Sequence, residues 1–370
     1  MKRIVSTVLL ASALVTTVPL VSPGLASAAT AAPTAAKLLD GVNELPRWID
    51  AGSLIVTRTV EEKKVDYKIN VKTKAFTPAL AEGTDGAELV VAPNGKSAVF
   101  QNEANQVFAI DFATQAVTKV SEDKSMKSEL QFSADGKKLF FLQGDKTNVV
   151  ASIDLADGKV TKLVEDKVDY KANLQVSADG SKLYYLVEKG GKLTADSPKE
   201  GDDKSVTDAK IELDLTDTEP QLFVFDTKAA EPKAVQLTSE KDDKLFLQML
   251  ADGRFVYVSV DTAKENAVPS LKLVSADGKE VKNLVADIAV LQSVRVAGDR
   301  LLILGEADGK KAIYEVNAAT GAKKKLVDVH SNTNQMYVSA DGKQIAISIA
   351  TEQGEKVAVL AGAAFEDVTK

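Results

Sequence analysis

Few residues in this chain have the chemistry of a catalytic centre. The sequence contains a single histidine, His330, and no cysteine. A Ser–His–acid triad would have to use His330, and no Gly-x-Ser-x-Gly sequence accompanies it. The lack of cysteine excludes a thiolate nucleophile, a thiolate metal site and disulfide bonds. We therefore expect neither histidine-based catalysis nor a zinc site.

Carboxylates are the one abundant reactive group, with 53 aspartates and glutamates in the chain. Two of them facing each other across a concave site could support glycosidase-like hydrolysis. Aromatic residues make up only 5% of the sequence, and Trp48 is the sole tryptophan, whereas sugar-binding sites are usually richer in aromatics. The expectation leans away from an enzyme, with no catalytic residue and no cofactor assigned, and a carboxylate-based hydrolase or lyase is kept as an alternative.

Residues 189–221 form an acidic segment with nine acids and five lysines. Its Thr194–Ser205 portion is typical of a loop, and Ala209–Leu215 alternates as an extra strand does. Three interpretations stay open. The segment is a solvated hairpin, an arm that contacts a partner through residues such as Asp202 and Asp203, or a Ca²⁺ site. The calcium interpretation is the weakest, because Asp-x-Asp-x-Asp-Gly spacing is absent.

The N-terminus has the order of an export signal. Lys2 and Arg3 precede the uncharged apolar run 4–20, and Ala26-Ser27-Ala28 fits signal peptidase. We predict a signal peptide at 1–28, a linker at 29–42 and a secreted or extracytoplasmic location, in the cell envelope or periplasm. Cleavage would remove two positive charges and take the net charge from −7 to −9, which disfavours nucleic acid and anionic membranes as partners. No second stretch of membrane-spanning length follows.

An internal repeat determines the predicted architecture. Gln131–Leu142 is nearly repeated by Gln175–Leu186 and again by Tyr337–Ser348, each around Ser-Ala-Asp-Gly. The turn glycines of all copies are Gly52, Gly95, Gly136, Gly180, Gly253, Gly298 and Gly342. Their spacings are 43, 41, 44, 73, 45 and 44 residues. A period near 43 with one lengthened interval is typical of a β-propeller.

Each repeat has the pattern of four short strands. In the third, these are Glu129–Ser133, Lys138–Gln143, Val149–Asp154 and Lys159–Val164, separated by Asp-Gly and Gly-Asp breaks. In the first repeat, Val42–Trp48 is the expected innermost strand. The fold class predicted is all-β, a β-propeller of about seven four-stranded blades over residues 43–370, with the insertion 189–221 in the fourth blade.

The Ser-Ala-Asp-Gly-Lys-Lys-Leu-Phe-Phe sequence resembles the WD40-like repeats of TolB-like propellers. Leu222-Phe-Val-Phe-Asp226 and Gln236-Leu-Thr238 stand where that family has its third and closing strands. The chain departs from the family by carrying alanine where proline is usual. The resemblance covers roughly residues 49–360 and implies the blade architecture. It implies no ligand, because these residues build blades.

The connections from the fourth strand of one repeat to the first strand of the next are highly charged. They should emerge at the same end of the propeller as the insertion, and this end is the predicted partner-binding face. The candidate residues are Asp123, Lys124, Asp166, Asp169, Tyr170, Lys171, Asp242, Asp243, Asp202 and Asp203. The predicted function is a monomeric, non-enzymatic scaffold that binds a protein or an envelope polymer. A structural component of the cell envelope is a further alternative.

Overall fold

The computed structural model describes residues 43–166, 168, 170–188, 192–195, 211–214, 219–296, 300–352 and 354–369. All regular elements in these ranges are β-strands. Within them, no helix is long and apolar enough to cross a membrane. The predicted signal peptide 1–28 and linker 29–42 lie outside the described residues.

The first three four-stranded sheets are built from strands that are consecutive in the sequence. Blade 1 contains β1 (Glu44–Asp50), β2 (Ser53–Val60), β3 (Lys63–Asn70) and β4 (Phe76–Pro78). Blade 2 contains β5 (Ala87–Val91), β6 (Ser97–Gln101), β7 (Val107–Asp111) and β8 (Val117–Ser121). Blade 3 contains β9 (Lys127–Phe132), β10 (Lys138–Gln143), β11 (Val149–Asp154) and β12 (Val160–Glu165).

The other four sheets follow the same order, except that a hairpin interrupts blade 4. Blade 4 contains β13 (Lys171–Val176), β14 (Lys182–Val187), β17 (Gln221–Asp226) and β18 (Ala234–Gln236). Blade 5 contains β19 (Asp242–Met249), β20 (Phe255–Asp261), β21 (Ser270–Val274) and β22 (Val281–Val285). Blade 6 contains β23 (Ala289–Val296), β24 (Arg300–Ala307), β25 (Lys310–Asn317) and β26 (Lys323–Asp328). Blade 7 contains β27 (Thr333–Val338), β28 (Ile345–Thr351), β29 (Gly354–Ala361) and β30 (Ala364–Asp367).

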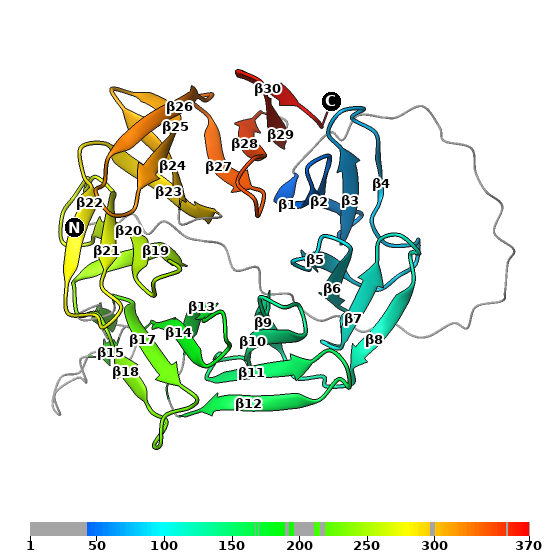
Figure 1. Cartoon of the computed structure of the whole chain (residues 1–370), viewed down its shortest axis with the longest axis horizontal. Coiled ribbons are helices and arrows are strands. Elements are labelled where there is room, and N and C mark those ends of the chain that lie inside the picture. The colour runs from blue at the N-terminus through cyan, green and yellow to red at the C-terminus, as the bar shows by residue number, and fades with distance from the viewer. Residues whose placement is uncertain are drawn as a thin grey trace, which may run out of the picture. The chain divides into compact units, whose positions relative to one another are not determined.

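The sheets stand side by side around a central axis, with the first strand of each nearest the centre (Figure 1). Neighbouring strands within every sheet are antiparallel. The fold is a seven-bladed β-propeller. The strands of the third repeat match the sequence-based prediction within two residues at each end.

The second strand of blade 3 contains a continuous apolar run because both of its faces are covered by neighbouring blades. In β10, Phe140 and Leu142 pack toward blade 4, whereas Leu139 and Phe141 pack toward blade 2. The outer strand β12 instead exposes several of its residues. A radial stack of sheets therefore explains why the second strand of a repeat is a continuous hydrophobic run.

Two glycines of blade 3 show different reasons for lacking a side chain. Gly136, in the β9–β10 hairpin, has a φ of +69°, and a Cβ there would meet nothing closer than 3.9 Å. Gly158, in the β11–β12 turn, has a φ of +70°, and its Cβ would lie 2.1 Å from the Val120 carbonyl oxygen of blade 2. Gly136 is required by backbone conformation alone. Gly158 is also required by the close approach of two blades.

Ring closure depends on side chains, since no strand is shared between blades 1 and 7. The Trp48 indole N–H donates to the Tyr337 carbonyl oxygen (3.1 Å), and the Asn43 amide donates to the Glu355 carbonyl oxygen (2.8 Å). Beneath them, Leu54 packs in one cluster with Val357. The predicted N-terminal strand is confirmed, shifted by two residues to β1.

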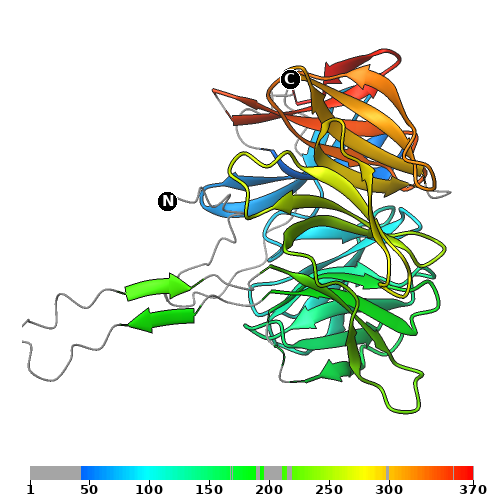
Figure 2. The same ribbon diagram turned by 90° about the vertical axis from the view of Figure 1, so that its left-hand side faces the viewer.

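The insertion in blade 4 contains β15 (Lys192–Ala195) and β16 (Ile211–Asp214), which pair as a separate two-stranded sheet (Figure 2). β16 falls within the predicted extra strand. Its partner β15 overlaps the start of the segment predicted as a loop, because an isolated strand needs an edge to pair with and the insertion supplies its own. The remaining loop residues lie outside the described ranges, as does Gly298.

Candidate binding surface at the loop end

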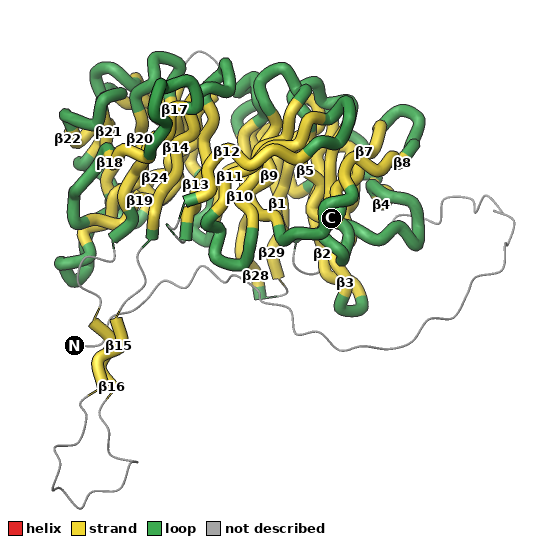
Figure 3. Tube along the Cα trace, turned by 90° about the horizontal axis from the view of Figure 1, so that it is seen from below, coloured by secondary structure: helices red, strands yellow, loops and turns green. Residues whose placement is uncertain are grey.

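All second-to-third and fourth-to-first strand connections emerge at one end of the propeller, which we call the loop end. It is the lower side of the blades in Figure 3, where β2 turns into β3. The connections also bond to one another. The Gly144 amide donates to the Met126 carbonyl oxygen (2.9 Å), and the Tyr170 amide donates to the Lys146 carbonyl oxygen (2.7 Å). The connections into blades 3 and 4 are thereby both held against the loop between β10 and β11 of blade 3.

A buried lysine anchors this end in three consecutive blades. Lys127, Lys171 and Lys244 stand at or near the start of the innermost strands of blades 3, 4 and 5, and their side chains have no solvent exposure. Each ammonium lies over an aromatic ring of its own blade, at 5.6–5.8 Å from the centroid. Such a position contributes a favourable cation–π interaction to an otherwise costly buried charge.

The ammonium groups also donate hydrogen bonds to backbone carbonyl oxygens of the loops. Lys171 Nζ donates to the carbonyl oxygens of Asn148 (2.8 Å) and Val168 (2.5 Å) and to Asp166 Oδ1 (2.6 Å). Lys127 Nζ likewise donates to carbonyl oxygens in the two connections beside it, at Asn105 (2.9 Å) and Ser125 (2.8 Å). Each of these two lysines therefore ties a fourth-to-first connection to the preceding blade's second-to-third connection.

Burial and hydrogen bonds shift the pKa values of Lys127 and its partner Asp123. Burial lowers the pKa of Lys127, although the neighbouring Asp123 carboxylate opposes this effect. Burial alone would raise the pKa of Asp123, but hydrogen bonds from Ser125 and the charge of Lys127 leave that pKa below its usual value. Asp123 and Lys127 thus each favour the charged form of the other, which strengthens the bond between them.

Asp242 is the centre of the corresponding network in blade 5. Its buried carboxylate accepts hydrogen bonds from Lys244 Nζ (2.8 Å), Lys272 Nζ (2.8 Å), Tyr257 Oη (3.2 Å) and the Ser259 hydroxyl. Burial would raise the pKa of Asp242, but the donated hydrogen bonds outweigh it and hold the pKa below 3.8. The same carboxylate raises the pKa of Tyr257, after burial, which is the larger cause.

Most of the large exposed apolar side chains of the described residues lie at the loop end, in blades 3 to 5. Nine large apolar side chains of the described residues are exposed, and six of them lie at this end. Five belong to blades 3 to 5 or the connections leading into them, and we call them the loop-end patch: Met126, Val168, Tyr170, Leu245 and Val268. Met126 and Val268 are more than half exposed, at 55% and 64%. Exposed apolar groups surrounded by charge are typical of protein contact sites.

The structure separates the predicted site residues into three groups. Lys124 and Tyr170 are exposed, and Asp123, Asp166 and Asp243 are partly exposed. Lys171 and Asp242 are buried at 1% and 3% exposure, so they position the loops beneath the surface and do not form part of it. Asp169, Asp202 and Asp203 lie outside the described residues.

Sequence reasoning missed the apolar part of this surface. Only Tyr170 of the loop-end patch was among the predicted residues. The available signal was the presence of single large apolar residues, such as Met126 and Val168, inside otherwise charged connections. A charged connection that is fully solvated has no need of them.

Carboxylates also come together near the axis at the same end. Partial burial raises the pKa of Glu188 in blade 4, and the negative charges of Asp243 in blade 5 and Glu129 in blade 3 raise it further. Glu129 Oε1 and Oε2 accept the backbone amides of Asn173 (2.9 Å) and Leu174 (2.7 Å). Glu129 thus clamps blade 3 to blade 4, and Glu129, Glu188 and Asp243 form what we call the acidic rim of the loop end.

The described residues contain no group of three His, Cys, Asp or Glu side chains positioned to hold a metal ion. The acidic part of the insertion, to which the Ca²⁺ interpretation refers, lies mainly outside those ranges. His330 is in an exposed loop, where its Nδ1 accepts the Asn332 backbone amide (3.1 Å). This bond shapes the turn that leads into β27.

No protein-family model matches the chain, and no curated protein matches it either. Several solved structures do match the chain. Oligogalacturonate lyase in complex with manganese is 12% identical with a TM-score of 0.61, and the match covers 86% of this chain and 89% of that one. The β-propeller domain of the Trilobed protease from Pyrococcus furiosus is 13% identical with a TM-score of 0.56, over 90% and 97% of the two chains.

The likeness establishes the fold. An acylaminoacyl peptidase complex with a chloromethyl ketone also matches, with 11% identity, a TM-score of 0.59 and 90% of this chain covered. This chain spans only 52% of that peptidase. A lyase and a peptidase thus share this propeller, and at such identities the likeness shows the fold alone.

Proposed function

We propose that this protein is a non-enzymatic binding scaffold whose loop end, on blades 3 to 5, holds a protein partner. The observation that carries the proposal is the loop-end patch of five exposed apolar side chains, three of which (Met126, Val168 and Tyr170) lie on connections that buried lysines hold in place. Fixed loops lose little conformational entropy when a partner binds, and apolar groups supply the contact energy. A TolB-like kinship and export from the cytoplasm are parts of the same proposal.

A protein partner is favoured over an envelope polymer by the composition of the surface. Polysaccharide sites use aromatic faces and many hydrogen-bonding groups, whereas this patch has Tyr170 as its only aromatic member and four aliphatic or thioether side chains. Met126 can adapt its shape to a partner surface. The acidic rim at Glu188 and Asp243 favours a partner with basic groups facing the axis.

The test compares two sets of exposed apolar residues. In the first variant Met126, Tyr170 and Leu245 become serine. In the matched control Val117, Val235 and Leu326, which are similarly exposed on β8, β18 and β26, become serine. We expect the first variant to lose at least tenfold in capture of protein from the native extract, with the control unchanged and both melting near the wild-type temperature.

Two further arms distinguish the alternatives. Deleting Thr194–Asp208 asks whether the insertion takes part, and weaker capture by this variant would extend the contact surface to it. Proteinase treatment of the extract separates a protein ligand from a polymer. Equal capture by the two serine variants, or capture that survives proteinase, would overturn the proposal.

A further inference from the structure

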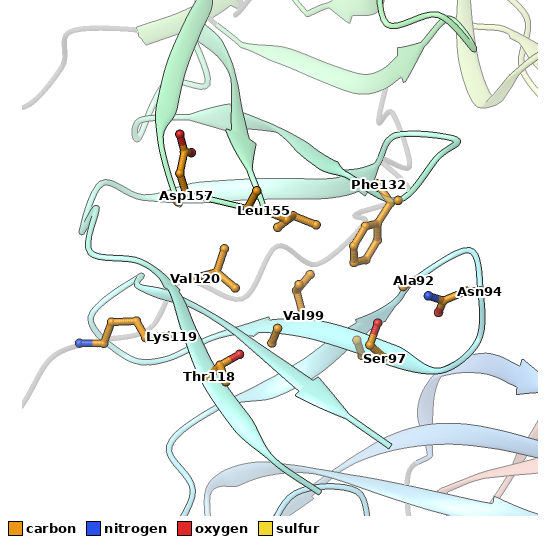
Figure 4. Close-up of a pocket in the computed structure, with 15 residues that line it drawn as sticks. Ala92, Asn94, Ser97, Val99, Thr118, Lys119, Val120, Phe132, Leu155 and Asp157 are labelled. Carbon is orange, nitrogen blue, oxygen red and sulfur yellow. The ribbon is translucent and has the colours of Figure 1, made fainter. Parts of the chain in front are cut away.

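A cleft of about 340 Å³ lies between blades 2 and 3 at the end opposite to the loop end (Figure 4). One wall is formed by β6, β7 and β8. The other comes from the end of β9 and the turns at Gly136 and Gly158. None of its lining residues belongs to the loop-end patch. The cleft is therefore independent of the surface proposed above.

Ala109 of blade 2 is a small residue in the wall of the cleft. Val99, Ala109 and Thr118 form a cross-strand row on the face of the sheet that looks toward blade 3. At the position of Ala109, blade 3 carries the small Ser152, blades 4, 5 and 7 carry Val224, Leu273 and Val359, and blade 6 carries Glu315. Ala109 thus fills less of the space toward the next blade than the residues of blades 4 to 7 do.

The floor of the cleft is apolar, although its lining as a whole exposes more polar than apolar surface. Val99 and Val120 of blade 2 face Phe132 and Leu155 of blade 3 across the gap (Figure 4). These four side chains belong to a hydrophobic cluster shared by the two blades. An apolar group that entered the cleft would continue this cluster and remove its surface from water.

Two hydroxyl groups face the cleft without a partner among the described residues. They belong to Ser97 on β6 and Thr118 on β8, and both oxygens turn toward the cleft in Figure 4. The charged groups nearby are already engaged. Lys119 Nζ pairs with Glu122 (3.2 Å), and Asp157 Oδ1 accepts the Lys159 amide (2.9 Å). The open neutral hydrogen-bonding groups of the cleft are thus the two hydroxyls, and the exposed carboxylate of Asp157 lies at its rim.

We propose that this cleft is a second binding site, which takes an aliphatic side chain of an extended peptide together with the adjoining peptide group. The side chain would occupy the space above Ala109, and the peptide group would bond to the hydroxyls of Ser97 and Thr118. The volume is at the lower end of the range for ligand pockets, which fits one or two residues and not a large cofactor.

The probe is N-acetyl-L-leucinamide, with N-acetylglycinamide as the control that lacks a side chain. Binding is followed by methyl NMR of Val99, Val120 and Leu155. We expect saturable shifts with leucinamide and a dissociation constant of about 1–10 mM, the range for a ligand of this size, with no such shifts for glycinamide. Absence of saturable shifts, or equal shifts with both probes, would overturn the proposal.

Two variants locate the site. Ala109→Leu fills the cleft and should weaken binding at least tenfold. Thr118→Val keeps the shape of the side chain but removes one hydroxyl, and it should weaken binding severalfold. Because Thr118 is exposed, this variant should fold normally, and it tests the site even if Ala109→Leu does not fold. Thr161→Val, at the equivalent position of blade 3, should leave binding unchanged. Unchanged binding in Ala109→Leu that is folded, or in Thr118→Val, would contradict this assignment.

Discussion

Replacing Asp242 with alanine should lower the free energy of unfolding by about 3–5 kcal/mol, the range measured when one partner of a buried charge pair is removed. The variant leaves the ammonium of Lys244 without its carboxylate in a site that water does not reach. It also leaves the buried hydroxyls of Tyr257 and Ser259 without the carboxylate to which they donate hydrogen bonds. Chemical denaturation measures the loss directly. The control is Glu265→Ala, an exposed acid of the same blade, with an expected change within about 0.5 kcal/mol.

The pH dependence of this effect has a definite sign. The pKa of Asp242 is lower in the folded protein than the ordinary 3.8, so its charged form stabilises the fold above that value. This stabilisation is lost as the pH falls through the folded-state pKa. The difference in stability between wild type and Asp242→Ala should therefore shrink below about pH 4. A difference that stayed constant down to pH 2 would show that the carboxylate charge is not the cause.

Replacing Leu54 with alanine should cost about 2–5 kcal/mol, as for other fully buried leucines, and should open the ring first. Leu54 belongs to the cluster that joins blades 1 and 7, where no strand is shared. Trp48 lies beside this junction and, as the only tryptophan, reports on it by fluorescence. We expect its transition to precede the loss of β-structure seen by circular dichroism.

The matched comparison for ring closure is Leu183→Ala. Leu183 is equally buried, but it packs between blades 3 and 4, which follow each other in the chain. It should destabilise by a similar amount with the fluorescence and dichroism transitions moving together. Identical behaviour of the two variants would mean that the closure at Trp48 is no weaker than the other blade junctions.

The fold was predictable from the sequence because the same local sequence signals recur in the blades. A tight hairpin such as that at Gly136 requires positive φ, and the apolar run after it marks a strand covered on both faces. These signals are local and recur with the period of the blade. The insertion was harder to place, since β15 has no apolar pattern and becomes a strand only by pairing with β16.

The candidate surface was only partly predictable. Lys171 and Asp242 were expected to be exposed because charged residues in a connection are usually solvated. Their burial depends on contacts that are distant in the sequence, such as the bond from Lys171 to Asn148 in the preceding blade. The apolar residue Met126 lacks any repeat or spacing signal. Its exposure follows only from how two connections meet.

The absence of cysteine allows the most direct test of partner binding at the loop end. A single cysteine carrying a photoreactive group is placed at Tyr170 in the loop-end patch, or at Lys343 in the β27–β28 hairpin at the opposite end. Both side chains are exposed, at 48% for the tyrosine residue and 77% for the lysine side chain. Irradiation in the native extract should give a protein adduct from position 170 and none from position 343. Adducts from position 343 alone, or equally from both, would contradict partner binding at the loop end.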